Sequence, residues 1–254
     1  MPADPDRIWT AALVVIGDEI LSGRTEDKNI AQVASWLTVQ GIRLREVRVV
    51  PDVEEAIVEA VNALRARHDY LFTTGGIGPT HDDITVDAVA RALGVDVVIH
   101  PTARAMLERY YTTRGGLNEG RLRMARVPAG ADLIENRMSG APGIRIGNLF
   151  LMAGVPHITA QMLASLDGRL EGGLPLVSET IGCWVPESEV AGLLGEAEHA
   201  HPGCQIGSYP FFREGKVGAN FVIRSTDAAA AAACARAVAE ALAAAGREPL
   251  PGGI

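Results

Sequence analysis

In the first two thirds of the chain, short apolar runs alternate with amphipathic stretches. Residues 11–16 are unbroken apolar residues ending at Gly17, which is typical of a strand buried on both faces. Apolar residues then recur at helical spacing over 28–40, up to Gly41. We therefore expect an α/β fold in three layers, with a mostly parallel sheet. The pattern continues as predicted strands at 42–50, 70–74 and 95–100, followed by helices that begin near Asp52, after Asp83 and at Pro101.

From about residue 143 onward the chain has a different pattern. Two short runs around Gly147-Asn148, within residues 143–152, predict a β-hairpin, and a helix is expected from about Pro156 to Leu166. Residues 170–175 are rich in Gly and Pro and suit a linker. We expect a larger α/β domain over 8–170 and a small α+β domain over 175–250. The predicted elements of the small domain are strand 176–185, helix 188–199, strands 205–210 and 217–225, and helix 227–245 capped by Asp227.

Composition narrows the class of protein. With 48% hydrophobic and 5% aromatic residues, the chain suits an Ala- and Val-packed α/β core. The formal net charge of −8 argues against nucleic acid or an anionic membrane as a partner, and no apolar run approaches a membrane span. Three widely spaced cysteines suggest reduced thiols, and no signal peptide is recognisable. We expect a cytoplasmic protein.

The unusual loops all follow predicted strands. They comprise residues 17–23, 50–52, 75–83 and 153–156. Because the carboxyl ends of parallel strands meet at one edge of a sheet, where α/β proteins bind ligands, these loops should converge on one crevice.

The loop at 75–83 is the most informative one. Gly75, Gly76 and Gly78 let backbone N–H groups approach a phosphate, although a tight structural turn explains such glycines about as often. Asp82 and Asp83 follow at once, and either cap the next helix or bind a metal. Two carboxylates beside a phosphate cradle would repel the ligand unless a divalent cation lay between them. This favours a metal or catalytic role over capping.

The other acidic residues near these loops are less specific. Asp27 and Asp52 are each as well explained by helix capping, and Asp52 has the spacing of a capping box with Glu55. Glu19 lies in a loop where no capping role is evident, which favours function. The loop residue His81 is best read as solvated. There is no zinc-type His/Cys cluster, nucleophile elbow or Walker lysine.

Together these motifs resemble the molybdopterin-binding fold of molybdenum-cofactor biosynthesis, and within it the amino-terminal part of the competence/damage-inducible CinA family. The resemblance is close over about 8–170 and looser beyond. Two departures are His81, where the family usually has Lys, and Met152-Ala-Gly154, where it usually has Leu-Pro-Gly. The motifs that carry it are residues 17–23, 27–29, 50–52, 73–85, 141–143 and 154–156.

This resemblance implies a phosphate-and-metal site for a nucleotide or pterin, and a homo-oligomer, either a dimer or a trimer. Our first choice is a pyrophosphatase that hydrolyses ADP-ribose-like nucleotides with Mg²⁺, Mn²⁺ or Co²⁺. The alternatives are a non-catalytic molybdopterin-binding protein and a molybdopterin adenylyltransferase. By motif, Gly75, Gly76, Gly78 and Thr80 would hold phosphate, Gly154 and Pro156 would line the base or pterin pocket, and Asp82 or Asp83 would hold the metal with Glu19 and Asp52 in support.

Overall fold

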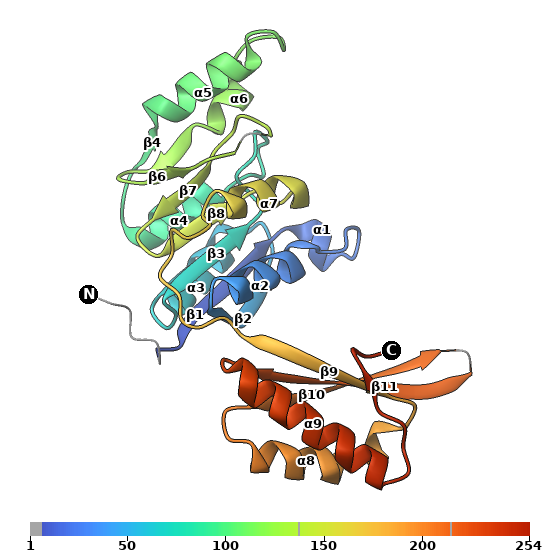
Figure 1. The fold of residues 1–254 in the computed structure, drawn as a ribbon. Helices are drawn as coiled ribbons and strands as arrows, with labels where there is room; N and C mark the ends of the chain where they lie inside the picture. Colours follow the sequence, from blue (N-terminus) through green and yellow to red (C-terminus); the bar gives the residue numbers. More distant parts are fainter. Residues whose placement is uncertain (1–6, 137, 214) are drawn as a thin grey trace. The chain divides into compact units, whose positions relative to one another are not determined.

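The chain forms two compact units in the computed structural model, which describes residues 7–136, 138–213 and 215–254 (Figure 1). Unit 1 is Met1–Gly173 and unit 2 is Leu174–Ile254. The boundary therefore falls within the Gly- and Pro-rich segment 170–175.

Unit 1 is built on a six-stranded sheet with the strand order β2-β1-β3-β8-β7-β6. Strands β2, β1, β3 and β8 are parallel, whereas β7 is antiparallel to both of its neighbours. The β7–β8 pair is the predicted hairpin around Gly147-Asn148, so the mostly parallel sheet with its hairpin is confirmed. The strands are β1 Trp9–Ile16, β2 Ile42–Val50, β3 Tyr70–Thr74, β6 Asp132–Ile134, β7 Gly143–Ile146 and β8 Leu149–Met152.

Helices cover both faces of this sheet and complete the three layers (Figure 1). Ala12 and Val14 of β1 pack in the cluster that contains α3 and α4, whereas Leu13 and Val15 pack in the cluster of α2 and α7. Since successive residues of a strand point to opposite faces, a strand buried on both sides is mostly apolar. The helices are α1 Asp18–Leu21, α2 Asn29–Val39, α3 Glu54–Arg65, α4 Thr85–Leu93, α5 Pro101–Tyr111, α6 Glu119–Arg123 and α7 Pro156–Ala164.

One of the predicted strands forms but does not belong to the parallel sheet. Within residues 95–100, the short strand β4 (Val97–Ile99) pairs with β5 (Arg126–Pro128) in a separate antiparallel ribbon. Val98 and Ile99 remain about 40% exposed, whereas strands inside the main sheet are buried. The sheet takes β6 at its edge instead, a three-residue strand too short to show a periodic pattern.

Unit 2 is a four-stranded antiparallel sheet with the order β10-β11-β9-β12. Its β-α-β-β-α-β sequence of elements is that of a ferredoxin-like unit. The predicted cap is confirmed, because the Asp227 carboxylate accepts from the N–H groups of Ala229 and Ala230. None of the helices in the described ranges combines the length and hydrophobicity needed to cross a membrane. The elements are β9 Val177–Cys183, η1 Glu187–Glu189, α8 Ala191–Ala200, β10 Gln205–Arg213, β11 Lys216–Ser225, α9 Ala228–Ala244 and β12 Leu250–Pro251.

Candidate functional site

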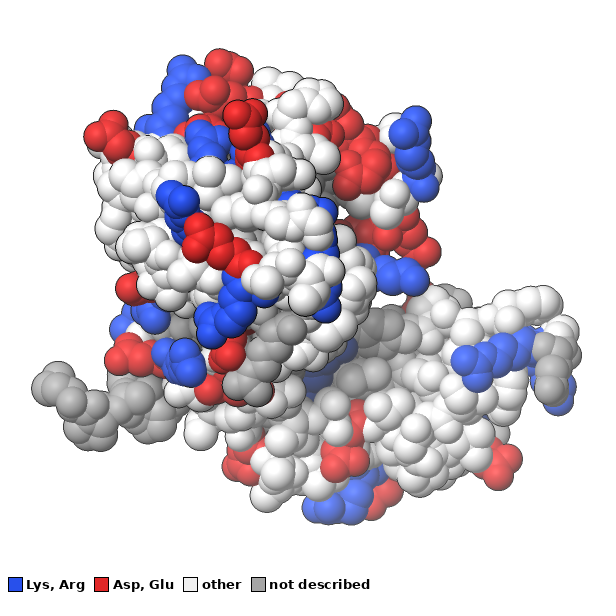
Figure 2. Space-filling model, turned by 90° about the horizontal axis from the view of Figure 1, so that it is seen from above, with Lys and Arg blue, Asp and Glu red and all other residues white. Residues whose placement is uncertain are grey.

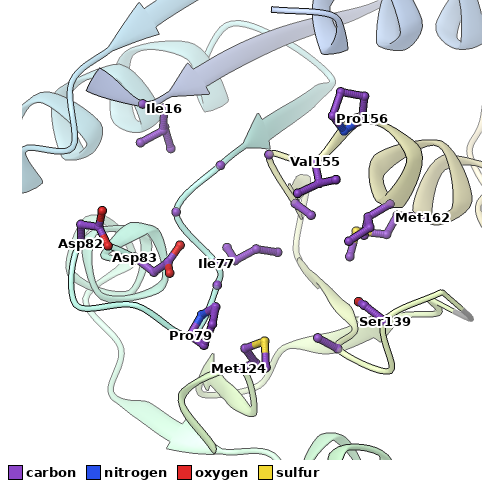
Figure 3. Close-up of a pocket in the computed structure, with 18 of the residues that line it drawn as sticks. Ile16, Ile77, Pro79, Asp82, Asp83, Met124, Ser139, Val155, Pro156 and Met162 are labelled. Atoms are coloured by element: carbon purple, nitrogen blue, oxygen red, sulfur yellow. The ribbon is translucent and has the colours of Figure 1, made fainter. Parts of the chain in front are cut away.

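A cavity of about 630 Å³ opens at the carboxyl ends of the parallel strands of unit 1 (Figure 3). Residues from all four predicted loops line it, and they follow β1, β2, β3 and β8 respectively. Further lining residues come from α5, the end of α6 and the loop before β7. The structure thus brings together the loops for the topological reason given by the sequence.

The first two glycines of the loop after β3 are required by the turn itself. Gly75 and Gly76 have φ angles of 101° and 67°, in the left-handed region that favours glycine. A Cβ on Gly75 would lie 2.1 Å from the carbonyl oxygen of Ile16, and one on Gly76 would lie 2.1 Å from Oγ1 of Thr85. The tight turn therefore accounts for these two glycines, and their contact with phosphate remains a prediction.

The next segment folds around the Asp83 carboxylate. The backbone N–H of Thr80 donates to Oδ2 of Asp83 at 2.7 Å, and the Thr80 hydroxyl donates to the same oxygen. A Cβ on Gly78 would lie 2.6 Å from that oxygen, so the glycine lets the carboxylate approach the loop. Helix α4 begins only at Thr85 and has no side-chain cap. Capping therefore explains neither Asp83 nor its neighbour Asp82.

Asp52 and Glu19 also line the cavity. The predicted capping box at Asp52 is wrong, because α3 begins at Glu54 with Val53 in the N-cap position and no side-chain cap. Oδ2 of Asp52 instead accepts from the backbone N–H of Asp18 at 2.9 Å, which joins the loop after β2 to the loop after β1. The second of the two carboxylate oxygens has no such backbone donor in the described contacts.

The pKa values of Asp52 and Asp82 are shifted in opposite directions. Partial burial raises the pKa of Asp52, and the nearby charges of Glu19, Asp18 and Asp82 raise it further, against the opposing hydrogen bond from Asp18. The nearby Thr80 hydroxyl, and after it the backbone N–H of Asp82 itself, lower the pKa of the Asp82 carboxyl, which keeps that group charged. A nearby cation would stabilise the charged form of Asp52 and so oppose this rise in its pKa.

The charged side chains among the described lining residues of the cavity are all acidic. Glu19, Asp52, Asp82 and Asp83 line it, and no Lys, Arg or His is among the described lining residues. Within the described ranges no three His, Cys, Asp or Glu side chains are close enough together to hold a metal on their own. Mg²⁺ often binds through one or two carboxylates together with substrate phosphates. The residues present fit that mode of binding, in which the ligand completes the coordination sphere.

The other half of the cavity is apolar. Ile77 of the glycine loop and Met124 after α6 lie across from Val155 and Met162 (Figure 3). Apolar walls suit an aromatic ring system, and cavities of a few hundred Å³ are usual for small ligands. The remaining apolar or weakly polar lining residues include Ile16, Pro79, Tyr111, Ala141, Pro142, Ala153, Pro156 and Ile158.

Gly154 holds this half close to the glycine loop. A Cβ on Gly154 would lie 3.3 Å from Cα of Gly75, so the two loops approach with backbone against backbone. The buried side chain of Asn29 donates to the Gly154 carbonyl at 2.7 Å, and Gln32 donates to that of Pro156 at 3.1 Å. Helix α2 thereby positions the predicted base or pterin pocket.

Sequence reasoning missed two supports of the site. Nη2 of Arg123 donates to the Asp83 carbonyl at 3.3 Å, and a Cβ on Gly120 would lie 3.3 Å from the Pro79 carbonyl, so α6 packs directly against the acidic loop. Asn136, only 2% exposed, donates to the hydroxyl of Ser139, a lining residue, and to the carbonyl of Ala141. Arg123 ends α6, and Asn136 follows β6, a strand that the sequence pattern did not predict, so only their three-dimensional neighbours reveal them.

The fold and the acidic, glycine-edged cavity define an α/β small-molecule-binding domain, and comparison with known proteins places it in a family. Residues 12–171 match the family described as "Probable molybdopterin binding domain", and the chain belongs to that family. Residues 175–249 match the family "FAD synthase, middle domain".

Individual relatives agree with this assignment. A protein of Aeropyrum pernix is 37% identical over 217 residues, which cover 80% of this chain and 79% of the relative. A CinA-like protein of Desulfosudis oleivorans is 35% identical over 209 residues, but the match covers only 51% of its length and 78% of this chain. The crystal structure of CinA from Thermoplasma acidophilum, a protein "with unknown function", matches 64% of this chain and 98% of that one with a TM-score of 0.60 and 32% identity. Unit 1 is thus a molybdopterin-binding-type domain like that of CinA-like proteins.

Proposed function

We propose that unit 1 is a metal-dependent pyrophosphatase that hydrolyses ADP-ribose-like nucleotides. The observation that carries this proposal is the cavity itself. Four carboxylates lie beside a glycine loop at one end, and the apolar half described above, here called the apolar slot, forms the other end. A dinucleotide-like ligand has the complementary shape and charge, since a flat base fits the slot and a diphosphate fits the loop. Because the wall supplies no positive charge, the diphosphate needs a divalent cation to bind there.

The residues divide the work as follows. The backbone N–H groups of Gly76 and Gly78 would hold phosphate oxygens, whereas those of Gly75 and Thr80 already donate to the Met152 carbonyl and to Asp83. Gly154 and Pro156 would line the slot for the base. Asp82 or Asp83 would bind the cation, with Glu19 and Asp52 in support. The cation would polarise the phosphoryl oxygens and neutralise the charge of the diphosphate. Water adds to one phosphorus while the bond from that phosphorus to the bridging oxygen breaks, so that ADP-ribose and water give AMP and ribose 5-phosphate.

Turnover of a panel of nucleotides tests the proposal. The full chain is incubated with ADP-ribose, FAD or NAD⁺ and with Mg²⁺, Mn²⁺ or Co²⁺, and the products are identified by mass spectrometry. We expect AMP and ribose 5-phosphate from ADP-ribose, loss of both with EDTA, and recovery when divalent ion is added in excess. Intact ADP-ribose after long incubation with all three metals would exclude this hydrolase.

A second candidate, binding of molybdopterin with or without adenylyl transfer, is favoured by the family to which residues 12–171 belong. The apolar slot would take the pterin instead of a base. An adenylyltransferase would leave ADP-ribose intact and release pyrophosphate from ATP only when molybdopterin is present. A binding protein would do neither, yet its melting temperature would rise with the ligand.

A further inference from the structure

The sheet of unit 2 has one face that packs against helices and one that does not. Ala219, Phe221 and Ile223 of β11 lie in the core cluster with residues of α8 and α9. Because strand residues alternate between faces, the other residues of β11 point to the open face. The register places the matching residues of β10 beside them. The open-face residues of the two strands are Lys216, Gly218, Asn220, Val222 and Arg224 of β11 and Gln205, Gly207, Tyr209, Phe211 and Arg213 of β10.

Aromatic rings lie flat on this open face. A Cβ on Gly218 would come within 2.5 Å of the Phe211 ring, and one on Gly207 within 2.9 Å of the Tyr209 ring. The two rings thus occupy the space that the glycines leave free above the sheet. Trp184, which follows β9, meets Phe211 edge to face with 5.3 Å between ring centroids. Tyr209 is still 46% exposed and Trp184 37% exposed, so the rings remain accessible.

A cation lies over each of these rings. The guanidinium of Arg213 lies 5.1 Å from the Phe211 centroid, that of Arg224 5.5 Å from Tyr209, and Nζ of Lys216 5.9 Å from Trp184. No acidic residue occupies an open-face position of β9, β10 or β11. Figure 2 shows basic side chains in the region of the β10–β11 hairpin, at the right of the view. The open face is therefore locally positive in a chain whose net charge is −8.

We infer that the open face of unit 2 binds single-stranded nucleic acid. Accessible rings that lie on a sheet suit stacking with bases. The cations close to these rings suit electrostatic contact with the phosphates between the bases. The four-stranded sheets of RNA-recognition domains use a sheet face in this way, although their stacking rings lie on different strands. A second copy of the chain fits less well, since symmetric pairing of this face would bring cations against cations. The net charge of −8 argues against nucleic acid only as an average over the whole chain, and this average hides the positive charges of the open face.

Contacts of residues 252–254 limit the size of the platform. The Ile254 N–H donates to Oδ1 of Asn220 at 2.9 Å, and the Gly252 N–H donates to the Thr180 carbonyl at 2.8 Å. Residues 252–254 thus cover the central part of the open face around β9. The strip that remains runs along β10 and the adjoining edge of β11, where the rings and cations lie.

Fluorescence anisotropy with labelled 12-nucleotide oligo-U and oligo-dT tests this inference on the full chain. With three cations in contact with phosphates, the slope of log K against log salt should be about −2, so that binding weakens about 20-fold between 50 and 200 mM salt. Loss of one stacked ring in Phe211→Ala should weaken binding by about 5- to 150-fold. The matched control is Phe212→Ala, since Phe212 is 71% exposed but points to the opposite face.

The outcomes separate the possible occupants. Binding to either oligonucleotide that is lost in Phe211→Ala but kept in Phe212→Ala, with both variants folded by circular dichroism, supports the inference. The ratio of RNA to DNA affinity then shows which strand is preferred. Equal loss in both variants, no binding at 50 mM salt, or equally strong competition by poly-glutamate would overturn it, the last in favour of an acidic protein partner.

Discussion

Gly76→Ala measures how strongly the glycine loop is held in the conformation that shapes the site. At a φ of 67°, alanine costs about 1 kcal/mol relative to glycine. The new Cβ would also lie 2.1 Å from Oγ1 of Thr85, so this buried hydroxyl must leave the Gly75 carbonyl, to which it donates at 3.0 Å. An unpaired buried group costs about 1–3 kcal/mol. The expected loss of unfolding free energy is therefore about 2–4 kcal/mol.

Gly94→Ala is a matched control. Gly94 has nearly the same φ, 69°, at the end of α4, but a Cβ there meets nothing within 4 Å. Its loss should be about 1 kcal/mol, from the backbone alone. Urea unfolding is followed by tryptophan fluorescence in a Trp184→Phe background, in which the remaining Trp9 and Trp36 both lie in unit 1, and it compares the two variants. Gly76→Ala should in addition weaken binding of a nucleotide or pterin, whereas Gly94→Ala should not.

A double-mutant cycle completes this experiment. In a Thr85→Ala background the clashing oxygen is absent, so Gly76→Ala should cost only slightly more than Gly94→Ala. If Gly76→Ala destabilises the wild-type protein no more than Gly94→Ala does, the contact with Thr85 does not hold the loop and the reasoning fails.

Further predictions concern the acidic end of the site and the assembly. Asp83→Asn should abolish metal-dependent turnover with little change in melting temperature, because the amide oxygen still accepts from Thr80; full activity would refute its metal role. Burial raises the pKa of Asp52 above its unfolded value, so the charged form of Asp52 disfavours folding at neutral pH. The variant Asp52→Asn should therefore be as stable as the wild type, or more stable by a few tenths of a kcal/mol. Turnover by the wild type should fall as the pH drops through this raised pKa. Arg123→Met, which loses the contact with the Asp83 carbonyl, should raise the metal concentration needed for half-maximal turnover, and an unchanged metal titration would count against it. Light scattering should show a dimer or trimer, and a monomer would contradict the expected oligomer.

The sequence alone determined most of the framework. The continuous apolar run of β1 and the helical spacing of α2 identify a doubly covered parallel sheet, because burial on both faces leaves no place for polar residues. That sheet in turn requires the loops after its strands to share one edge, which brings Asp52 beside Glu19 and the glycine loop. These inferences need only local pattern and topology.

Tertiary structure decided what local pattern leaves open. Asp52 follows a strand and precedes a helix, so the sequence is equally consistent with a helix cap and with a hydrogen bond that joins two loops. The structure shows the hydrogen bond between loops, because the Asp18 N–H lies within reach of the Asp52 carboxylate. The exposed β4 has a strand-like sequence, but in the structure β6 pairs with β7 at the edge of the main sheet and β4 pairs with β5 instead. Arg123 supports Asp83 from 40 residues away, and the charge of a site depends on such distant neighbours. Sequence records which groups follow one another, whereas contacts between remote segments depend on how the elements pack.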